Sequence, residues 1–304
     1  MGALAPPSVD RRAGRALNRV SIADQAWTRR SHRARILLGE RPHAESLLRF
    51  YLALLDLQAL VCDAAAAERW GEAVTLPEGV AGPRLRLEQL PLDELTPRFA
   101  AFCRSLPGSA PGPILRAAEV VSAGREQVRR DLLAALLNGE DLTAEACALS
   151  CEPAPLVFLP RGFLQPIAEA VSGRLEASYD SVRTPTCPRC GWPPQVSVLS
   201  DEPEAQGNRR LICAFCAAGW MFSRSVCPGC GVSGEEGLEI HVDDGALQHV
   251  RVEACRTCRR YLKSVDLRVT GLAVPLVDDV ATPELDLWAA DQGLEKITPN
   301  VLGM

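Results

Sequence analysis

The sequence has 304 residues, of which 47% are hydrophobic and 23% are charged, and its formal net charge is -5. This composition is typical of a globular protein rather than a disordered chain, and the length suggests more than one domain. The mildly acidic balance excludes the global positive field that promotes non-specific nucleic-acid binding.

The N-terminal region shows no export signal. Residues 11–12 and 29–30 are double arginines, but the only apolar stretch after the second pair is 36–38, which is too short for a signal peptide. The longest apolar segment, 47–67, is interrupted by one arginine, two aspartates and one glutamine, which disfavours a membrane span. We therefore expect a cytoplasmic protein without membrane insertion.

Residues 15–180 carry the apolar spacing of α-helices. A wide apolar stripe predicts a central buried helix over 45–68. A second helix is predicted over 114–137, because Pro113 suits a helix start and Asn138-Gly139 suits a left-handed C-cap. Shorter helices are predicted over 13–38, 92–104, 143–149 and 162–179. Residues 1–182 are thus predicted to form an all-helical domain, in which we identify no catalytic signature and no organic cofactor site.

A second region begins near Arg183, where short alternating runs such as 195–199 replace the helical spacing. It contains four Cys-x-x-Cys pairs, and the last two repeat the first two at offsets of 40 and 42 residues, which indicates an internal duplication. We predict one four-cysteine module at 183–226, another at 227–270, and a helical tail at 271–304. Within the tail, a helix capped by Thr282 is predicted over 282–293.

The expected fold class is therefore α+β. An N-terminal all-helical domain is followed by two tandem rubredoxin-like or zinc-ribbon modules and a C-terminal helix. Small ribbons bury little apolar surface, so we expect bound ions to hold them folded.

The paired cysteines have the spacing of metal knuckles, in which a tight turn aims two sulfurs at one ion. A gap of 22 or 24 residues within each repeat is long enough for a β-hairpin, whereas only 10 residues separate the repeats. We therefore pair the motifs sequentially, although an interleaved pairing stays open. The predicted ligands are Cys187, Cys190, Cys213 and Cys216 at one ion, and Cys227, Cys230, Cys255 and Cys258 at the other.

These ligand sets limit the chemistry. Four thiolates accept zinc or iron and leave no vacant position for an activated water, which argues for a structural or redox ion and against hydrolysis. Gly191 and Gly231 follow the first pair of each repeat and permit a positive φ, as in rubredoxin-like knuckles. Ala217 and Arg259 stand at the same place in the second pairs, so the likeness to rubredoxin is half complete.

Other candidate residues receive simpler interpretations. His241 and His249 lie within the second repeat, but every cysteine already has a place, so we do not assign them as ligands. The aromatic residues near the cysteines are expected to pack against the thin ribbon core; they are Trp192, Trp220 and Tyr261. The remaining cysteines lie in apolar surroundings and receive no function; they are Cys62, Cys103, Cys147 and Cys151. Eight cysteines in metal-like pairs, without an export signal, argue against disulfides.

The sequence around the cysteine pairs is distinctive as well. It reads CPRCGWP at 187–193, LICAFC at 211–216, CPGC at 227–230 and CRTCRRYLK at 255–263. The tail adds VDD at 277–279, LDL at 285–287 and TPN at 298–300. In order and spacing these motifs resemble the formate dehydrogenase accessory protein family of the FdhE type. The likeness covers roughly 185–304, while the helical half matches in character and position.

This resemblance implies a cytoplasmic accessory factor that is not an enzyme. Such a factor binds the catalytic subunit of respiratory formate dehydrogenase before export and helps to bring it to an active state. The resemblance also implies that the eight paired cysteines hold two metal ions, with iron favoured over zinc. Arg259, where an ideal repeat has glycine, puts the symmetry of the two sites in doubt more than their existence.

Two other functions are considered. A nucleic-acid-binding zinc ribbon is favoured by arginines such as Arg209 and Arg256, but residues 181–270 hold 11 Lys or Arg against 10 Asp or Glu. A strong phosphate footprint is therefore not expected. A rubredoxin-like electron carrier is disfavoured by the half-matched knuckles. Client recognition is expected in a groove between the helical and ribbon domains, because binding sites favour domain interfaces.

Overall fold

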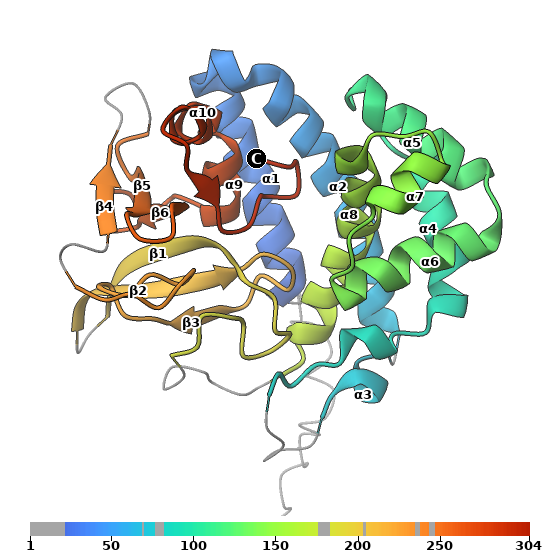
Figure 1. Ribbon diagram of the computed structural model, residues 1–304, viewed down its shortest axis with the longest axis horizontal. Coiled ribbons are helices and arrows are strands. Elements are labelled where there is room, and N and C mark those ends of the chain that lie inside the picture. Colours follow the sequence, from blue (N-terminus) through green and yellow to red (C-terminus); the bar gives the residue numbers. More distant parts are fainter. Residues whose placement is uncertain are drawn as a thin grey trace, which may run out of the picture.

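The chain forms a lobe of helices beside a lobe built on one β-sheet (Figure 1). The computed structural model describes residues 22–68, 70–76, 82–175, 183–202, 205–234, 238–242 and 247–304. The expected α+β class, with an N-terminal helical region, two four-cysteine clusters and a C-terminal helix, is confirmed. The start of the helix predicted over 13–38 and the end of the one predicted over 162–179 lie outside the described residues.

The helical lobe is built around two long neighbouring helices, α2 and α8. Its helices are α1 (Ile22–Glu40), α2 (Glu45–Ala67), α3 (Trp70–Val74), α4 (Leu92–Arg104), α5 (Gly112–Ala123), α6 (Glu126–Asn138), α7 (Thr143–Ala148) and α8 (Pro153–Ser172). Phe50 of α2 packs on Phe158 of α8 with ring centroids 5.9 Å apart. The central helix predicted over 45–68 is therefore confirmed.

Helix α8 begins at Pro153, earlier than the helix predicted over 162–179. It contains Pro160 and Pro166, and these prolines account for the difference because they disfavour a helix locally. A proline lacks the N–H that would bond the carbonyl four residues earlier, which for Pro166 is that of Gly162. Gln58 of α2 donates its amide Nε2–H to this carbonyl at 2.8 Å. The buried glutamine thus replaces the missing backbone hydrogen bond and ties α2 to α8.

The segment Pro42–Ala67 is long and apolar enough to cross a membrane by length and composition alone. In the structure α2 contacts α1 and α8, and Leu48, Leu54 and Leu55 are at most 1% exposed. This packing is that of a core helix, and a core helix passes the same test.

The single helix predicted over 114–137 is wrong, because two helices, α5 and α6, occupy this range. The chain breaks at Gly124, whose ψ of 178° is extended. Arg129 of α6 donates through Nη1 to the carbonyls of Val121, Ser122 and Gly124 at 3.2, 3.2 and 2.6 Å. These bonds satisfy carbonyls at the end of α5 that a continuous helix would satisfy itself. The C-cap at Gly139 is left-handed as predicted, with φ 71°.

Both cysteine repeats contribute to the same sheet. Its strand order is β3 (Gly219–Met221), β2 (Ala205–Cys213), β1 (Pro194–Glu202), β6 (Arg260–Asp266), β5 (Val250–Cys255) and β4 (Leu238–His241), and β7 (Glu295–Lys296) pairs with β6. The hairpins expected within the repeats are β1–β2 and β4–β5, and both are antiparallel. The repeats join where β1 runs parallel to β6, from Val196 opposite Lys263 to Leu199 opposite Asp266.

Two helices of the tail, α9 (Pro275–Val280) and α10 (Pro283–Asp291), pack on this sheet, and α9 also contacts α1 (Figure 1). The helix α9 is missing from our sequence prediction. Thr282 stands at the N-cap position of α10, but its hydroxyl makes no capping bond. It donates instead to the carbonyl of Asp278 at 2.9 Å, so the predicted cap is wrong in its contact.

The Asp278-Asp279 motif lies at the seam between the two lobes, and both side chains are fully buried. Asp278 pairs with Arg33 of α1 at 2.6 Å and with His249 at 2.7 Å. Asp279 pairs with Lys263 and Lys296 at 2.9 and 2.7 Å. Each buried carboxylate therefore has at least one cationic partner, Arg33 for Asp278 and the two lysines for Asp279, as burial of a charge requires. The motif joins α1, α9 and the sheet.

Candidate metal centres

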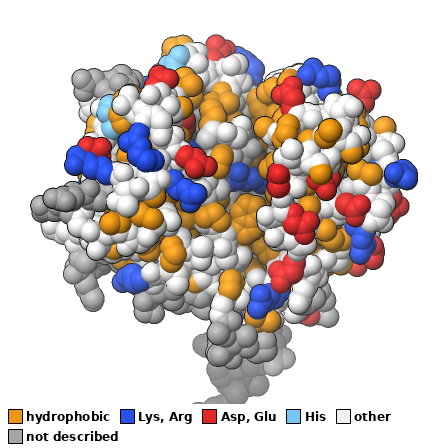
Figure 2. All heavy atoms as spheres, viewed as in Figure 1, with side chains coloured by type: hydrophobic (Ala, Val, Ile, Leu, Met, Phe, Trp, Pro, Cys, Tyr) orange, Lys and Arg blue, Asp and Glu red, His pale blue; other side chains and the backbone are white. Residues whose placement is uncertain are grey.

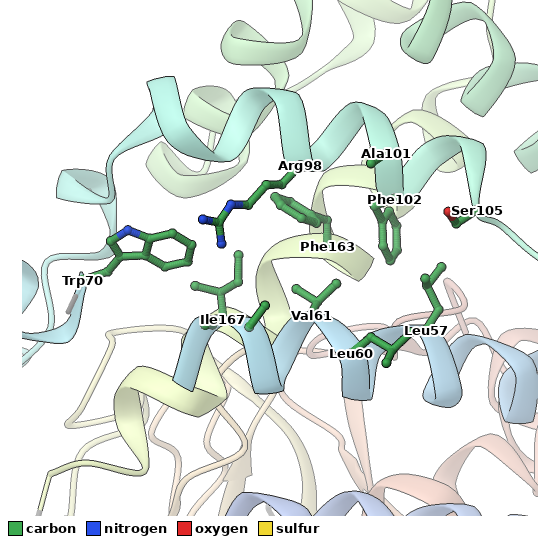
Figure 3. Close-up of a pocket in the computed structure, with 12 residues that line it drawn as sticks. Leu57, Leu60, Val61, Trp70, Arg98, Ala101, Phe102, Ser105, Phe163 and Ile167 are labelled. Carbon is green, nitrogen blue, oxygen red and sulfur yellow. The ribbon is translucent and has the colours of Figure 1, made fainter. Parts of the chain in front are cut away.

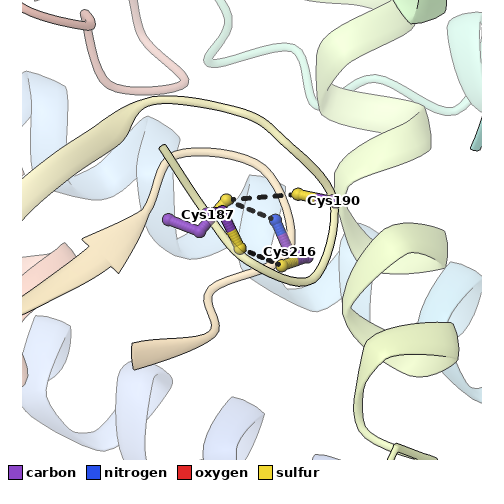
Figure 4. A group of neighbouring side chains, drawn as sticks. Cys187, Cys190 and Cys216 are labelled. Atoms are coloured by element: carbon purple, nitrogen blue, oxygen red, sulfur yellow. Dashed lines mark hydrogen bonds between the residues drawn. The ribbon is translucent and has the colours of Figure 1, made fainter. Parts of the chain in front are cut away.

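The first cluster brings together Cys187, Cys190, Cys213 and Cys216, whose sulfurs all lie within 4.8 Å of one another. Cys187 Sγ lies 3.6 Å from Cys216 Sγ, and Cys190 Sγ lies 3.4 Å from Cys213 Sγ. Figure 4 shows Cys187, Cys190 and Cys216 pointing toward one centre from two facing loops. The loop of Cys187 precedes β1, and the loop of Cys216 connects β2 to β3.

The second cluster repeats this arrangement with Cys227, Cys230, Cys255 and Cys258. Cys227 Sγ lies 3.8 Å from Cys258 Sγ, and Cys230 Sγ lies 3.7 Å from Cys255 Sγ. The structure thus groups the eight cysteines sequentially, and the interleaved alternative does not occur. Their role as metal ligands stays a prediction.

The spacing of the sulfurs can be compared with that of a metal–thiolate tetrahedron. A metal–sulfur bond of ~2.3 Å places tetrahedral sulfurs about 3.8 Å apart. The four sulfur–sulfur separations given above range from 3.4 to 3.8 Å, so each cluster has the size that a single zinc or iron ion requires. The two clusters can therefore hold two ions.

Backbone turns hold the sulfurs in this arrangement. The N–H of Cys187 donates to the carbonyl of Trp192, and the N–H of Cys227 to that of Val232, at 2.8 and 2.9 Å. Backbone N–H groups also point at sulfur: Cys216 N–H donates to Cys213 Sγ at 3.4 Å. Such bonds stabilise a thiolate and support its use as a ligand.

All four knuckles place the residue after the second cysteine at positive φ. The values are 81° and 77° for Gly191 and Gly231, and 53° and 56° for Ala217 and Arg259. Ala217 and Arg259 thus adopt the turn without the freedom of glycine, which costs roughly 1–2 kcal/mol per residue. Arg259 replaces the glycine of an ideal repeat, but its backbone adopts the same turn as that of Ala217. The two sites are therefore alike in backbone conformation at this position. Residue type alone underestimated the likeness between the knuckles.

Protonation controls access of a cation to these sulfurs. Burial raises the pKa of the Cys213 thiol. It also raises the pKa of Cys227 to about 12, against the opposing effect of the Gly229 and Cys230 N–H groups. Burial acts in the same direction on Cys255, but the N–H groups of Cys258 and Thr257 bring its pKa to about 7. Because a cation must replace thiol protons, binding should release protons and weaken as the pH falls.

The histidines of the second repeat have other partners. His241 stacks on Trp288 with ring centroids 3.6 Å apart, and His249 bonds Asp278. Within the described residues, neither joins a cysteine cluster. The prediction that cysteines alone form the sites is consistent with this geometry.

The aromatic residues near the clusters pack as predicted. Trp192 stacks on Phe215 at 4.2 Å between centroids, and the fully buried Trp220 donates its indole N–H to the carbonyl of Thr184 at 2.8 Å. The hydroxyl of Tyr261 donates to Asp286 at 2.7 Å. These contacts support a packing role.

A cleft of about 510 Å³ lies beside Cys216, where α1 and the end of α8 approach the first cluster. Arg30 and Glu169 form an ion pair in its lining at 2.9 Å, and Arg174 donates to the carbonyl of Ala66. The cleft coincides with the expected groove between the two parts of the chain, and its binding role stays a prediction. On the surface view, the face shown in Figure 2 is also hollowed between the two lobes.

A second, apolar pocket of about 250 Å³ lies within the helical lobe between α2, α4 and α8 (Figure 3). Leu60 at its margin is 68% exposed. Arg98 lies 4.9 Å from the centroid of the Trp70 ring and pairs with Glu68 at 2.7 Å. We assign this pocket no ligand.

Comparison with known proteins identifies two family domains in the C-terminal half. Residues 186–224 match the family model described as the central domain of FdhE, and 227–302 match that of its C-terminal domain. The chain is 34% identical over 148 residues to a "Protein FdhE homolog" from Aquifex aeolicus, which spans 49% of this chain and 52% of that protein. A homolog from Haemophilus ducreyi is 27% identical over 88% of this chain and 85% of its own length.

The fold is also found in a solved structure. The crystal structure of the FdhE protein from Pseudomonas aeruginosa matches with a TM-score of 0.65, covering 91% of this chain and 95% of that chain at 24% identity. Because this match covers 91% of the chain, it includes the helical lobe. The likeness in fold therefore extends beyond the region of the cysteine motifs. By contrast, the sequence matches to the Aquifex protein and to a homolog from Stutzerimonas stutzeri span about half and 37% of those proteins.

Proposed function

The chain belongs to the FdhE family, and from this premise we propose that it is a cytoplasmic accessory factor required to assemble or activate respiratory formate dehydrogenase. It binds the catalytic subunit of that enzyme and holds two metal ions through its eight paired cysteines. The observation that carries the proposal is the pair of four-sulfur clusters within the two matched FdhE domains.

The architecture of the clusters favours an accessory role over catalysis. Each ion would have four sulfur ligands and no open position, so hydrolytic chemistry through a bound water is not supported. The ions would instead hold the knuckles in place or carry an electron. For this reason no catalytic residue is proposed.

The client is proposed to dock in the cleft beside Cys216. Three arginines, Arg30, Arg174 and Arg189, line this cleft with one glutamate, Glu169. Charge complementarity therefore favours an acidic segment of the client. Arg174→Glu should weaken the complex with the catalytic subunit at least about tenfold, or ~1.4 kcal/mol. Arg49→Glu, at an exposed arginine of α2 that pairs with Glu45, is the matched control, and equal affinity of both variants would contradict this docking site.

Complementation tests the proposed role itself. A strain lacking this chain should lose formate dehydrogenase activity and regain it with the wild-type gene. Cys230→Ser and Cys213→Ser should fail to restore activity, whereas Cys147→Ser, at an exposed cysteine outside the clusters, should restore it fully. Undiminished activity in the deletion strain would refute the proposal.

A rubredoxin-like electron carrier is the second candidate. The positive φ values of Ala217 and Arg259 favour it, because they give all four knuckles the turn that the sequence alone assigned to two. Protein purified without oxygen should then contain iron with thiolate charge-transfer absorption and undergo reversible one-electron reduction. Colourless protein with two zinc ions would exclude this candidate and leave a scaffold role.

A further inference from the structure

The two clusters differ in how far other molecules can reach their sulfurs. In the first cluster Cys187, Cys213 and Cys216 are at most 4% exposed, and Cys190 is half-buried. In the second cluster, Cys230 is exposed and Cys258 is half-buried. One edge of the second cluster is therefore open to solvent.

The first cluster is covered because both of its knuckles are bonded to the helical half of the chain. The backbone N–H groups of Arg84 and Leu85 donate to the carbonyls of Pro188 and Arg189 at 3.3 and 2.7 Å. From α8, the buried Arg161 donates to the carbonyl of Ala214 at 3.2 Å. Movement of either knuckle would break these bonds and open the seam between the lobes.

Arg189 strengthens the same seam from the other side. Its Nη1–H donates to the carbonyl of Ser172, at the end of α8, at 2.6 Å. Cys187, Cys213 and Cys216 also belong to the apolar core that contains Leu48 and Phe163 of the helical lobe. Release of an ion from the first cluster would thus disturb the packing at the seam between the two lobes.

The second cluster has a different setting. It lies with β4, β5 and β6 at the side of the sheet that faces away from α4 to α8 (Figure 1). The described bonds of its first knuckle are local, such as Gly231 N–H to the carbonyl of Cys227 at 2.9 Å. The space where a Cβ atom of residue 231 would lie is open, with no atom within 4 Å. The Cys230 side of this cluster can therefore move or be approached without disturbing the helical lobe.

We propose that the clusters have separate roles: the first is a permanent structural site, and the second is a site of ligand exchange for soft thiol donors. This inference rests on the proposal that both clusters hold ions. In the exchange, an incoming thiol binds at the open edge as its sulfur–hydrogen bond breaks. The bond between the ion and Cys230 Sγ would break in turn, and Cys230 Sγ would take up the proton. No electron is transferred, so neither an oxidant nor a reductant is needed.

Metal release from the full-length protein tests this division. The protein loaded with two equivalents of Zn²⁺ is mixed with excess dithiol chelator, and the release of zinc is followed together with pulsed iodoacetamide labelling of free thiols. We expect two phases of one ion each, with the fast phase at least about tenfold faster, a barrier difference of ~1.4 kcal/mol. Peptide mass spectrometry should find the label of the fast phase on Cys227, Cys230, Cys255 and Cys258.

A pair of variants tests the cause. Arg161→Leu removes the bond from α8 to the first cluster and should accelerate the slow phase while leaving the fast phase unchanged. Arg256→Leu removes an exposed ion pair with Glu239 beside the second cluster and should change neither phase. Release in one phase, or first labelling of Cys213 and Cys216, would overturn the division of roles alone. Binding of fewer than two ions would overturn the metal assignment as well.

Discussion

The residue after each Cys-x-x-Cys pair sets the knuckle turn, and its backbone makes a specific prediction. Gly231 has a φ of 77° and open space around it, so Gly231→Ala should destabilise the metal-loaded protein by roughly 1–2 kcal/mol through backbone strain alone. Ala217 has a φ of 53°, so Ala217→Gly should relieve strain and stabilise the protein by roughly 0.5–1 kcal/mol.

Denaturant unfolding with saturating metal measures both effects. Ala218→Gly, at the neighbouring alanine that does not have a positive φ, is the control and should not stabilise. A loss of stability in Ala217→Gly would show that the methyl group contributes packing that outweighs the strain.

The buried thiols of the helical lobe make a second prediction at this scale. Burial raises the pKa of Cys62 to about 11 and that of Cys103 to about 12. Both should therefore stay protonated and unreactive toward iodoacetamide at pH 8, because the thiolate is the nucleophile. Cys147, which is exposed, should react in the native protein, and all three should react in denaturant. Peptide mapping measures the labels, and native labelling of Cys103 as fast as Cys147 would contradict the burial argument.

At the scale of single residues, the sequence was sufficient to find the eight cysteines and to favour their sequential grouping, although it left an interleaved pairing open. Their spacing is a local property of the chain and needs no knowledge of the remaining fold. It was not sufficient for Ala217 and Arg259, because a positive φ in a residue with a side chain is imposed by the closed cluster rather than favoured locally. The pairing of Asp278 with Arg33 could not be predicted from the sequence either, since the two residues lie 245 positions apart.

At the scale of elements, Gln58 makes the clearest prediction. Its amide bonds the Gly162 carbonyl that Pro166 leaves unpaired within α8. Gln58→Leu should destabilise the helical lobe by roughly 1–3 kcal/mol, because a buried carbonyl loses its partner. Gln127→Leu removes an exposed bond to Asp131 and should cost less than about 0.5 kcal/mol. Thermal unfolding followed by circular dichroism compares the two, and equal effects would show that Gln58 is dispensable.

Helices with a continuous apolar stripe, such as α2 and α4, could be predicted from the sequence almost to the residue. The separation of α5 from α6 could not, because Gly124 alone is compatible with a helix interior and the three carbonyl bonds of Arg129 arise only after folding. The early start of α8 was missed for a related reason. Its prolines argue against a helix locally, and a side chain from α2 compensates for one of them.

At the scale of the molecule, the sheet lobe has a lean apolar core of its own. The separate core beside α10 contains eight buried residues, all modest in size except Tyr261. Sequence analysis led us to expect that bound ions hold this region folded, but it did not predict that β1 and β6 join both repeats in one sheet. Parallel pairing between distant strands leaves little trace in local periodicity.

The small apolar core of the sheet lobe predicts how the protein should respond to metal removal. Structural zinc contributes ~10 to 16 kcal/mol to the folding of small metal domains, which equals or exceeds the whole stability of a typical domain at ~5–15 kcal/mol. Chelation should therefore unfold residues 184–268. The helices α2, α4 and α8 should survive, because contacts such as Phe99 on Phe163 lie within their own lobe. Arg33 would lose Asp278 if α9 detached, but α1 would then expose the guanidinium to water rather than leave it buried and unpaired.

Far-UV circular dichroism and limited proteolysis, before and after chelation under reducing conditions, measure this outcome. Most of the helical signal should persist, while new cleavages should appear between 184 and 268. Protein treated with chelator already saturated with zinc is the control. A cleavage pattern unchanged by complete metal removal would mean that apolar packing and the buried Lys263–Asp279 pair suffice to hold the sheet, and that the cysteine clusters serve chemistry rather than folding.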